Sequence, residues 1–268
     1  AAIQEVFEEH ITGAPGMEKV KELVRRKLMP TPGAVMNACK LLYGEIGDLM
    51  VVDVGGATTD VHSVTAGGGD DAPGVSNTEP LAKRTVEGDL GIYANRESLI
   101  REVGWMELSK ELGFDVRPVS GSMGPIPSSS EELALSVRLT FEAARIALDR
   151  HAGRVKLRCG AGGPVRVPLG RDLSRVKWII GTGGALVRLP GGREALEQLK
   201  ATGGGPRSGS GRPGSLGTGG WDPAEERMLP SEEARVVLDG DYIMAQAGVL
   251  AARFPGAALS LLRASLGL

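Results

Sequence analysis

The sequence has little cysteine, few aromatic residues, no excess of basic residues and no long hydrophobic run. Cys39 and Cys159 are the only cysteines in 268 residues, which excludes a disulfide framework, a zinc site and a cysteine-ligated iron–sulfur cluster and favours the reducing cytoplasm. Lys and Arg number 31 and Asp and Glu 33, so the net charge of -2 excludes a generally basic nucleic-acid-binding protein. Arg253 and Arg263 interrupt the most apolar stretch well short of the ~20 residues that cross a bilayer.

Glycine and charged residues are plentiful by contrast. Charged residues make up 24% and hydrophobic residues 41% of the chain, the balance of a soluble globular protein. The length allows about two domains, or one large domain with a sizeable core. Glycine accounts for 40 of the 268 residues, and nine of these lie between positions 201 and 220. Because that stretch is also rich in Ser and Pro, we expect residues 201–230 to form a glycine-rich surface loop or insertion.

Hydrophobic patterning predicts an α/β protein. Short valine-rich runs at 49–54 and 59–65, separated by a loop that begins with two glycines, predict strands that pair as a hairpin. Ser129 and Glu132 have the spacing of a capping box, which predicts a helix over 130–151. The remaining predicted elements are helices at 3–10, 17–29, 31–43, 89–103, 105–112 and 192–200, two helices within 242–266, and strands at 155–159, 165–167 and 176–180.

The end of the first predicted strand carries the most specific chemistry. Asp53 stands there among valines, where an ionised carboxylate is costly unless a cation or several donors meet it. A hydrated Mg²⁺ carried by nucleotide phosphates would satisfy Asp53, because Mg²⁺ retains most of its waters and takes few protein ligands. The Gly55-Gly56 pair lets a phosphate approach the backbone N–H groups, and the Thr58-Thr59 pair adds hydroxyl donors. The alternative is a tight hairpin in which Asp53 and Asp60 accept hydrogen bonds from turn amides.

A second glycine-rich turn, Gly181-Thr182-Gly183-Gly184-Ala185, follows the strand predicted at 176–180. A strand that runs into glycines and then into a helix is a common place for a bound nucleotide. This turn is not a Walker loop, because no Lys-Ser/Thr follows, and it lacks the full dinucleotide-binding spacing. A simple strand-to-helix turn explains it equally well on spacing alone.

Together, the two segments resemble those of the actin-like ATPases, which have a ribonuclease H-like fold and include actin, chaperone ATPases and sugar and acetate kinases. The resemblance implies that the first segment is the second phosphate loop and that the later glycines pack against the adenosine of ATP. It makes Asp53 and Asp60 the candidate catalytic residues, with Asp53 organising Mg²⁺. The candidate nucleotide-binding residues are Gly55, Gly56, Ala57, Thr58, Thr59, Glu87, Gly88, Asp89, Gly181, Thr182, Gly183, Gly184 and Ala185.

Four stretches narrow the resemblance within this superfamily. They are Met29 to Val35, Asp53 to Ser63, Arg84 to Gly91 and Leu238 to Ala245, and the third, Arg-Thr-Val-Glu-Gly-Asp-Leu-Gly, is the most particular. They are similar to stretches of the glutamate mutase accessory proteins, the GlmL or MutL family. The resemblance implies an ATP- and Mg-dependent cytoplasmic protein that reactivates adenosylcobalamin-dependent aminomutases. Its expected partners are the aminomutase subunits, and neither nucleic acid nor a membrane.

The same resemblance predicts the domain organisation. Residues 1–47 form a helical interlobe segment, 48–200 the second, nucleotide-binding lobe, 201–230 the insertion and 231–268 a C-terminal helical return. An actin-like ATPase should open with a first phosphate loop, Asp-x-Gly-x-Thr/Ser, and no such sequence precedes Asp53. We therefore expect the C-terminal part of a longer protein. On its own it should bind ATP with about millimolar affinity and hydrolyse it negligibly, whereas the whole protein is a possible ATPase.

Two other functions are open at this stage. One is a small-molecule kinase or a hydantoinase- or oxoprolinase-type hydrolase on the same fold, and the other is an actin-like structural or scaffold ATPase. Glu87 and Asp89 are explained most simply as acidic residues that open a helix, although their position in the fold could face the ribose. The histidines His10, His62 and His151 share no metal-ligand spacing, so we expect each to be a surface or hydrogen-bonded residue.

Overall fold

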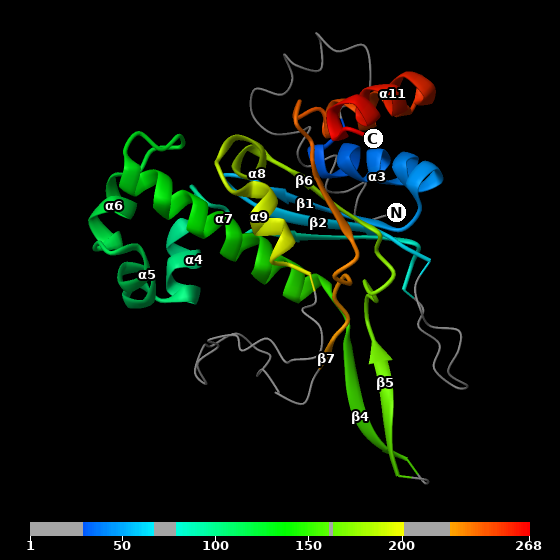
Figure 1. Ribbon diagram of the computed structural model, residues 1–268, viewed down its shortest axis with the longest axis horizontal. Helices are drawn as coiled ribbons and strands as arrows, with labels where there is room; N and C mark the ends of the chain where they lie inside the picture. The colour runs from blue at the N-terminus through cyan, green and yellow to red at the C-terminus, as the bar shows by residue number, and fades with distance from the viewer. Residues whose placement is uncertain (1–28, 67–78, 161–162, 201–225) are drawn as a thin grey trace.

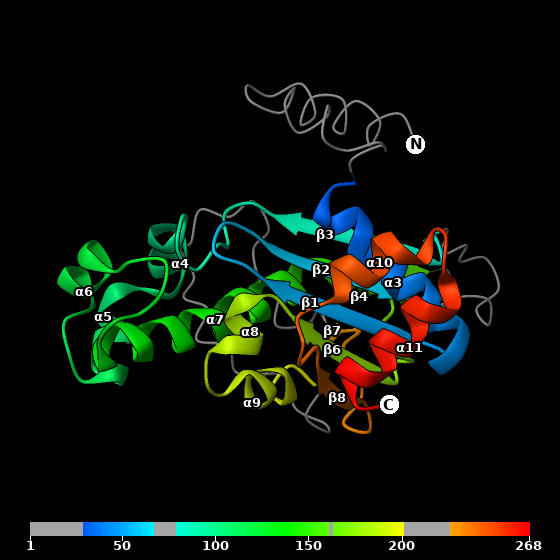
Figure 2. The same cartoon turned by 90° about the horizontal axis from the view of Figure 1, so that it is seen from above.

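A mixed five-stranded sheet forms the centre of the computed structural model, which describes residues 29–66, 79–160, 163–200 and 226–268 (Figures 1 and 2). Its strand order is β3-β2-β1-β6-β8. The strands are β1 (Leu49–Val54), β2 (Thr59–Val64), β3 (Ala82–Glu87), β6 (Trp178–Thr182) and β8 (Arg235–Leu238). β2 is antiparallel to β1 and β3, whereas β6 is parallel to both β1 and β8. Four of these strands therefore run in one direction, and β2 runs in the other.

The long helix α7 (Ser130–His151) covers one face of the sheet and is buried along most of its length. The predicted cap is present, because the Glu132 N–H donates to Ser129 Oγ at 3.1 Å. In a capping box the carboxylate of Glu132 would accept from the N–H of Ser129. Here it accepts instead from the N–H and the hydroxyl of the preceding residue, Ser128. The same layer contains α4 (Arg96–Val103), α5 (Trp105–Leu112), α6 (Val116–Ser122), α8 (Gly184–Arg188) and α9 (Gly192–Glu197) (Figure 1).

Three helices cover the opposite face, namely α3 (Thr31–Ile46), α10 (Met244–Ala251) and α11 (Pro255–Leu266). Val35, Cys39 and Leu42 are buried at helical spacing on α3, as the sequence predicts, and belong to one hydrophobic cluster with residues of β1, β2 and β6. α10 crosses α3 closely, because Gly248 has no side chain there: a Cβ on it would overlap the carbonyl oxygen of Ala34. The sheet thus lies between two helical layers.

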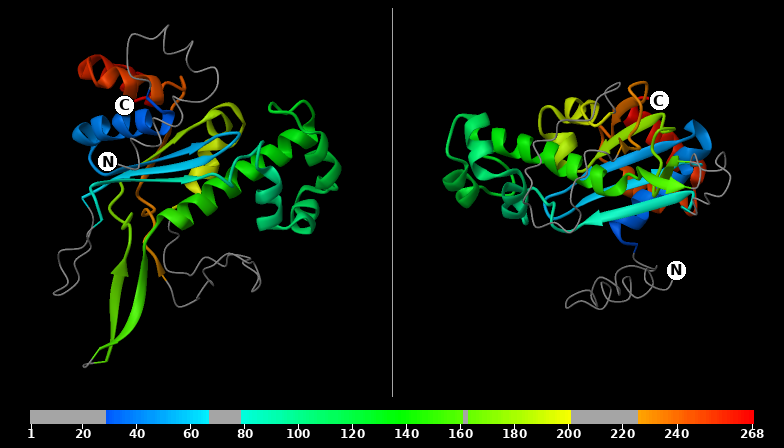
Figure 3. Two further views of the ribbon diagram at one scale, coloured as in Figure 1. Left: turned by 180° about the vertical axis from the view of Figure 1, so that it is seen from behind. Right: turned by 90° about the horizontal axis from the view of Figure 1, so that it is seen from below.

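A second, smaller sheet projects from the body of the molecule (Figures 1 and 3). It consists of the antiparallel hairpin β4 (Arg154–Gly160) and β5 (Gly163–Leu169), with β7 (Glu226–Arg227) paired along the base of β4. β4 follows α7 directly in the chain. The two strands of this hairpin confirm the predictions at 155–159 and 165–167.

Several predicted elements are confirmed and others are wrong. The β1–β2 hairpin, α5, α7 and the two C-terminal helices lie where the sequence predicts. Residues 88–95 form turns and not the start of a helix, which begins only at Arg96. The strand predicted at 176–180 begins at Trp178 and includes Gly181 and Thr182. The predictions do not include α6, β3 or β8, and β8 shows that the C-terminal segment contributes a strand as well as helices.

Some predictions fall outside the described residues or are not tested. The helices expected before residue 29 and most of the stretch 201–230 lie outside the described ranges. The domain boundaries stay predictions. Within the described ranges, every helix is too short or too polar to cross a lipid bilayer.

Candidate functional site

The parallel strands β1, β6 and β8 end at the same edge of the central sheet. The register pairs Asp53 with Thr182, and Gly181 with Leu238, the last residue of β8. Asp60, the second residue of β2, lies directly opposite Asp53. The carboxyl ends of parallel strands are where α/β proteins most often bind ligands, so the two predicted glycine-rich segments meet at a candidate binding edge.

The carboxylate of Asp53 has no hydrogen-bond partner among the described residues, although the residue is mostly buried. Burial raises its pKa to about 7, and the negative charges of Asp60 and Asp239 add to the effect. Asp60 is buried too: one carboxylate oxygen accepts from the Thr58 hydroxyl at 3.1 Å, and the other has no partner in the described structure. The alternative in which both carboxylates accept from turn amides is therefore wrong.

The loop between β1 and β2 presents unbonded backbone donors. Its carbonyl groups are used, because Gly55 and Gly56 accept hydrogen bonds from the backbone of residues 92–94. The N–H groups of Gly56, Ala57 and Thr58 make no hydrogen bond to any residue that the structure describes. Gly56 and Ala57 are also exposed. Three successive N–H groups of this kind can bind an anion.

The two predicted threonine hydroxyls differ in availability. Thr58 Oγ1 donates to Asp60 and is partly exposed. Thr59 Oγ1 is buried and donates to the carbonyl of Leu90 at 2.7 Å, on the α7 side of the sheet. Thr59 thus holds the loop against the following segment, and its hydroxyl has a structural partner already.

Gly183 brings the second glycine-rich segment into contact with the first. It has a φ of 88°, a conformation that favours glycine. A Cβ at this position would overlap the carbonyl oxygen of Val54 and crowd the carboxylate of Asp53. Gly184 and Ala185 follow in the short helix α8. The close approach of β1 to the β6–α8 turn therefore depends on the absence of a side chain at Gly183.

Asp239, immediately after β8, is a site residue that the sequence did not single out. It is fully buried and accepts four hydrogen bonds, two from side chains and two from backbone N–H groups at the start of α10. The side-chain donors are Thr182 Oγ1 at 2.9 Å and Ser265 Oγ at 2.6 Å. Asp239 therefore joins β6, α10 and α11 at the candidate edge. The sequence feature that could have indicated Asp239 is a carboxylate directly after the short apolar run of residues 236–238.

Tyr242, which precedes α10, borders the same edge, near Asp53 and Asp239. Its φ of 55° is rare for a residue with a side chain, and its N–H donates to the carbonyl of Asp239 at 2.9 Å. It is 44% exposed. Burial of its hydroxyl and the nearby charge of Asp53 raise the pKa of Tyr242. Strained residues of this kind gather at functional sites.

Glu87, Gly88 and Asp89 lie beside the loop but have a different role from the predicted helix start. Glu87 ends β3, and both acidic side chains bind Arg150 of α7 at 2.7 to 3.0 Å. Hydrogen bonding to Arg150 lowers the pKa of Asp89. Asn95 Nδ2 donates to the carbonyls of Gly88 and Ala57, which ties the two loops together. No helix begins here, because residues 88–95 form turns.

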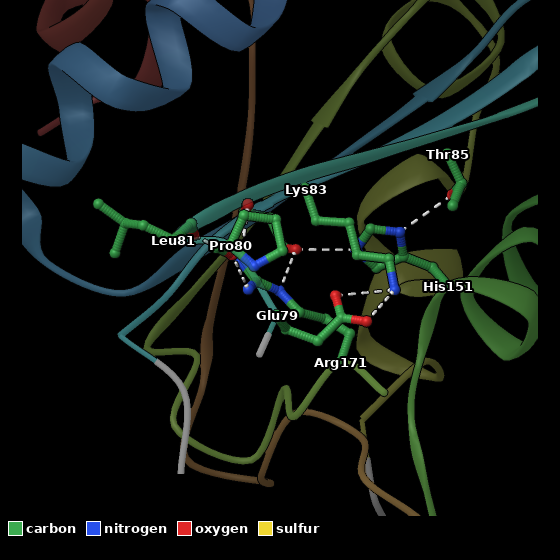
Figure 4. Close-up of polar contacts among 8 residues, drawn as sticks. Glu79, Pro80, Leu81, Lys83, Thr85, His151 and Arg171 are labelled. Atoms are coloured by element: carbon green, nitrogen blue, oxygen red, sulfur yellow. Dashed lines mark hydrogen bonds and ion pairs between the residues drawn. The ribbon is translucent and has the colours of Figure 1, made fainter. Parts of the chain in front are cut away.

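A second polar cluster lies toward the other end of the sheet, between β2, β3 and α7 (Figure 4). His151 is within 2.8 Å of Ser63 Oγ and 3.0 Å of Thr85 Oγ1, so both ring nitrogens have partners. Arg171 is almost fully buried and donates to the hydroxyl and carbonyl of Ser63 and to the carbonyls of Pro80 and Leu81 at 2.7 to 2.9 Å. His151 is thus the hydrogen-bonded histidine that was predicted.

His62 does not fit the same prediction. It is fully buried on the α3 side of β2, and neither ring nitrogen has a partner in the part of the chain that the structure describes. Burial and the charge of Arg84 lower its pKa to about 3. His10 lies outside the described residues.

The residues at the edge fit a nucleotide-borne Mg²⁺ better than a metal held by protein alone. The described residues contain no group of three or more His, Cys, Asp or Glu side chains able to hold a metal ion. Mg²⁺ needs no such group, because it is commonly bound by one or two carboxylates together with phosphates and waters. Within the described ranges, Asp53 offers one carboxylate without a partner, and the following loop offers three N–H groups without an acceptor.

These features define a mixed α/β protein with a candidate anion-binding edge at the carboxyl ends of its parallel strands. The MutL protein family model matches residues 1–266, and the chain belongs to that family. The protein named Protein MutL from Clostridium tetanomorphum is similar, with 33% identity over 277 residues. The match covers 97% of this chain and 55% of the relative, so the chain spans about half of that protein's length.

Proposed function

We propose that this chain is the nucleotide-binding lobe of an actin-like ATPase that reactivates an adenosylcobalamin-dependent aminomutase such as glutamate mutase. Its ligand is ATP with Mg²⁺, bound where β1, β6 and β8 end. One observation carries the nucleotide assignment: among the described residues, neither the mostly buried carboxylate of Asp53 nor the three N–H groups of the loop that follows β1 has a hydrogen-bond partner. Membership of the MutL family supports the mutase assignment.

A carboxylate and a phosphate at one edge require a cation between them, because two anions repel each other. Mg²⁺ would supply that charge, and Asp53 would hold it through its hydration shell. The N–H groups of Gly56, Ala57 and Thr58 would donate to phosphate oxygens. Gly183, which lies against β1 because it has no side chain, would border the adenosine. Asp60 lies opposite Asp53, where it holds the Thr58 hydroxyl in place.

Reactivation of a partner requires that ATP and ADP favour different conformations. In a two-lobed ATPase the nucleotide lies between the lobes, and closure of the cleft changes the outer surface. Only the differential affinity of the two nucleotides for the open and closed states can drive such a change. The MutL family membership and the five-stranded sheet with one antiparallel strand support this assignment to an actin-like lobe.

The nucleotide assignment is tested by measuring ATP binding with and without Mg²⁺, by ligand-observed NMR or equilibrium dialysis. We expect binding at about millimolar affinity that requires Mg²⁺, and Asp53→Asn should weaken it at least tenfold. Glu107→Gln is the matched control, because Glu107 is exposed on α5, and this variant should bind Mg-ATP with the same affinity as the wild type. Equal affinity of the wild type and Asp53→Asn for Mg-ATP would overturn the assignment.

The mutase assignment is tested in the longer protein with inactivated glutamate mutase. ATP-dependent recovery of mutase activity is expected, and Asp53→Ala should abolish both this recovery and Mg-ATP turnover while circular dichroism shows an intact fold. ADP release that depends on a small-molecule substrate, without any effect on the mutase, would identify a kinase or hydrolase instead.

A further inference from the structure

The small sheet of β4, β5 and β7, here called the arm, is not part of the nucleotide edge. It extends away from the central sheet and its helical layers (Figures 1 and 3). Residues 154–169 contain four basic residues and no acidic residue, although the whole chain has a net charge of -2. Positive charge is therefore concentrated on the projecting part of a protein that is slightly acidic as a whole.

The strand register divides the hairpin into two faces. Arg154 lies opposite Leu169, and Lys156 opposite Val167, and such cross-strand partners share a face. Because side chains alternate along a strand, Val165 belongs to this face too. Val165 is 51% and Leu169 37% exposed. We call this set the arm face: Arg154, Lys156, Val165, Val167 and Leu169.

The other surfaces of the hairpin are less suited to a partner. On the opposite face, Glu226 of β7 places a negative charge beside Arg166, with which it forms an ion pair, and this charge would repel an acidic partner. Along its outer edge, β5 contains Pro164 and Pro168, which lack the N–H groups that an added strand would need. A small hairpin with an exposed apolar face is only marginally stable by itself and gains from burial of that face. Docking through the arm face is therefore favoured over strand addition.

The base of the arm is firmly attached to the body. Arg171, two residues after β5, makes the four side-chain hydrogen bonds described above (Figure 4), and its carbonyl accepts from the Gly153 N–H at 2.6 Å. Arg227 of β7 binds Asp149 at 2.7 Å. The neighbouring Arg150 binds Glu87 and Asp89 beside the candidate phosphate loop. The C-terminal end of α7 thus contacts both the arm and the nucleotide edge.

We propose that the arm face docks an acidic protein surface with an apolar centre. The identity of the partner rests on the proposed function, under which that surface belongs to the aminomutase. Opposite charges across an interface speed and orient association, and the aliphatic residues between them supply the buried contact. Residues 154–169 include no aromatic side chain on which a base could stack, which disfavours single-stranded nucleic acid as the partner.

The test is a binding measurement between the chain and purified glutamate mutase subunits at two salt concentrations. The variant Lys156→Glu with Val165→Asp should weaken binding at least tenfold, and the wild-type affinity should fall with salt. The matched control, Arg101→Glu with Ile126→Asp, makes the same chemical changes on α4 and on a position that is 80% exposed near α6, and should change affinity less than twofold. Arg166→Gln on the opposite face should also have little effect.

A photo-cross-linking residue provides a second readout that does not depend on the charge variant. Placed at Val165 it should capture the mutase, and placed at Ile126 it should not. Equal binding by the arm variant and the control would overturn the docking proposal and leave the proposed function standing. No binding of the mutase by the wild type would overturn both. Loss of binding to a single-stranded oligonucleotide in the arm variant, without a loss for the mutase, would assign the arm face to nucleic acid instead.

Discussion

The two faces of β2 hold buried polar side chains that differ in their hydrogen bonding. Toward α7, Ser63 joins His151 and Arg171 in a network in which both ring nitrogens of the histidine have partners. Toward α3, His62 has no partner for either ring nitrogen in the described structure, and Asp60 has none for one oxygen. Ser63 on one face and His62 and Asp60 on the other all belong to β2, and all three are buried. The extent of burial therefore does not explain why their hydrogen bonding differs.

We infer from this difference that the α7 face of β2 serves stability and that its α3 face serves function. A buried polar network with all its partners present stabilises a single packing, whereas a buried polar group without a partner costs free energy. The satisfied face attaches the arm and joins β2, β3 and α7. The unsatisfied face is the one on which Asp53 and Asp60 lie, next to the unbonded N–H groups. Proteins retain such costs where chemistry requires them.

The largest expected effect follows from removing the centre of the satisfied face. Arg171→Met leaves acceptors on Ser63, Pro80 and Leu81 without a buried donor. Each such loss costs about 1–3 kcal/mol, so the free energy of unfolding in urea should fall by about 4 kcal/mol. Arg166→Met on the exposed arm is the control, with a change below about 0.5 kcal/mol. A loss below about 1 kcal/mol for Arg171→Met would show that the network is not stabilising.

On the unsatisfied face, Asp53→Asn should increase stability in a pH-dependent manner. The pKa of about 7 in the folded state lies above the ordinary value of 3.8, so the folded protein binds more protons between these values. Stability therefore falls as pH rises through this window, and the full penalty is present above about pH 7. Without nucleotide, the variant should gain on the order of 2 kcal/mol at pH 8 and little below pH 4. Urea unfolding at both pH values checks this, and an equal gain at both would contradict it.

His62 and His151 allow the two faces of β2 to be compared with substitutions of the same kind. At pH 7, His151→Leu should cost about 1–2 kcal/mol, because Ser63 and Thr85 lose a buried partner, whereas His62→Leu should be neutral or slightly stabilising. Thermal or urea unfolding of the two variants measures the contrast. Equal losses would remove the distinction between the two faces.

The same histidines predict sensitivity to acid. Burial lowers the pKa of each to about 3, below the ordinary value of 6.5, so the unfolded chain binds more protons between these values. Wild-type stability should fall as pH drops through this window. His62→Leu should reduce that fall, and an unchanged pH profile in this variant would contradict the assignment.

The smallest effect is expected for a polar pair that lies on neither face. The Arg166–Glu226 ion pair on the arm is more than 60% exposed on both sides. Glu226→Gln should therefore change the free energy of unfolding by less than about 0.5 kcal/mol, and high salt should remove the difference. A larger, salt-independent change would mean that the arm is coupled to the body more tightly than its exposure implies.

The sequence predicted those parts of the structure that depend on residues close together in the chain. Asp53 and its glycine loop were predictable because an apolar run, a turn and an alternating strand follow one another within a few residues. Asp239 and Tyr242 reach the same edge from the far end of the chain, and no spacing rule connects them to Asp53. β3 was missed because an edge strand rich in charged residues lacks an apolar pattern, and β8 because it has only four residues.

The position of β1 in the sheet has a consequence for the folding of the chain. One edge of β1 pairs with β2 a few residues later, but the other edge pairs with β6, which begins only at Trp178. While the chain is being synthesised, the valine-rich β1 therefore has an unpaired edge until well over a hundred further residues have been made. An apolar strand with a free edge is a template for association with other chains. The strand that presents Asp53 is thus open to association with other chains until β6 has been made and can pair with it.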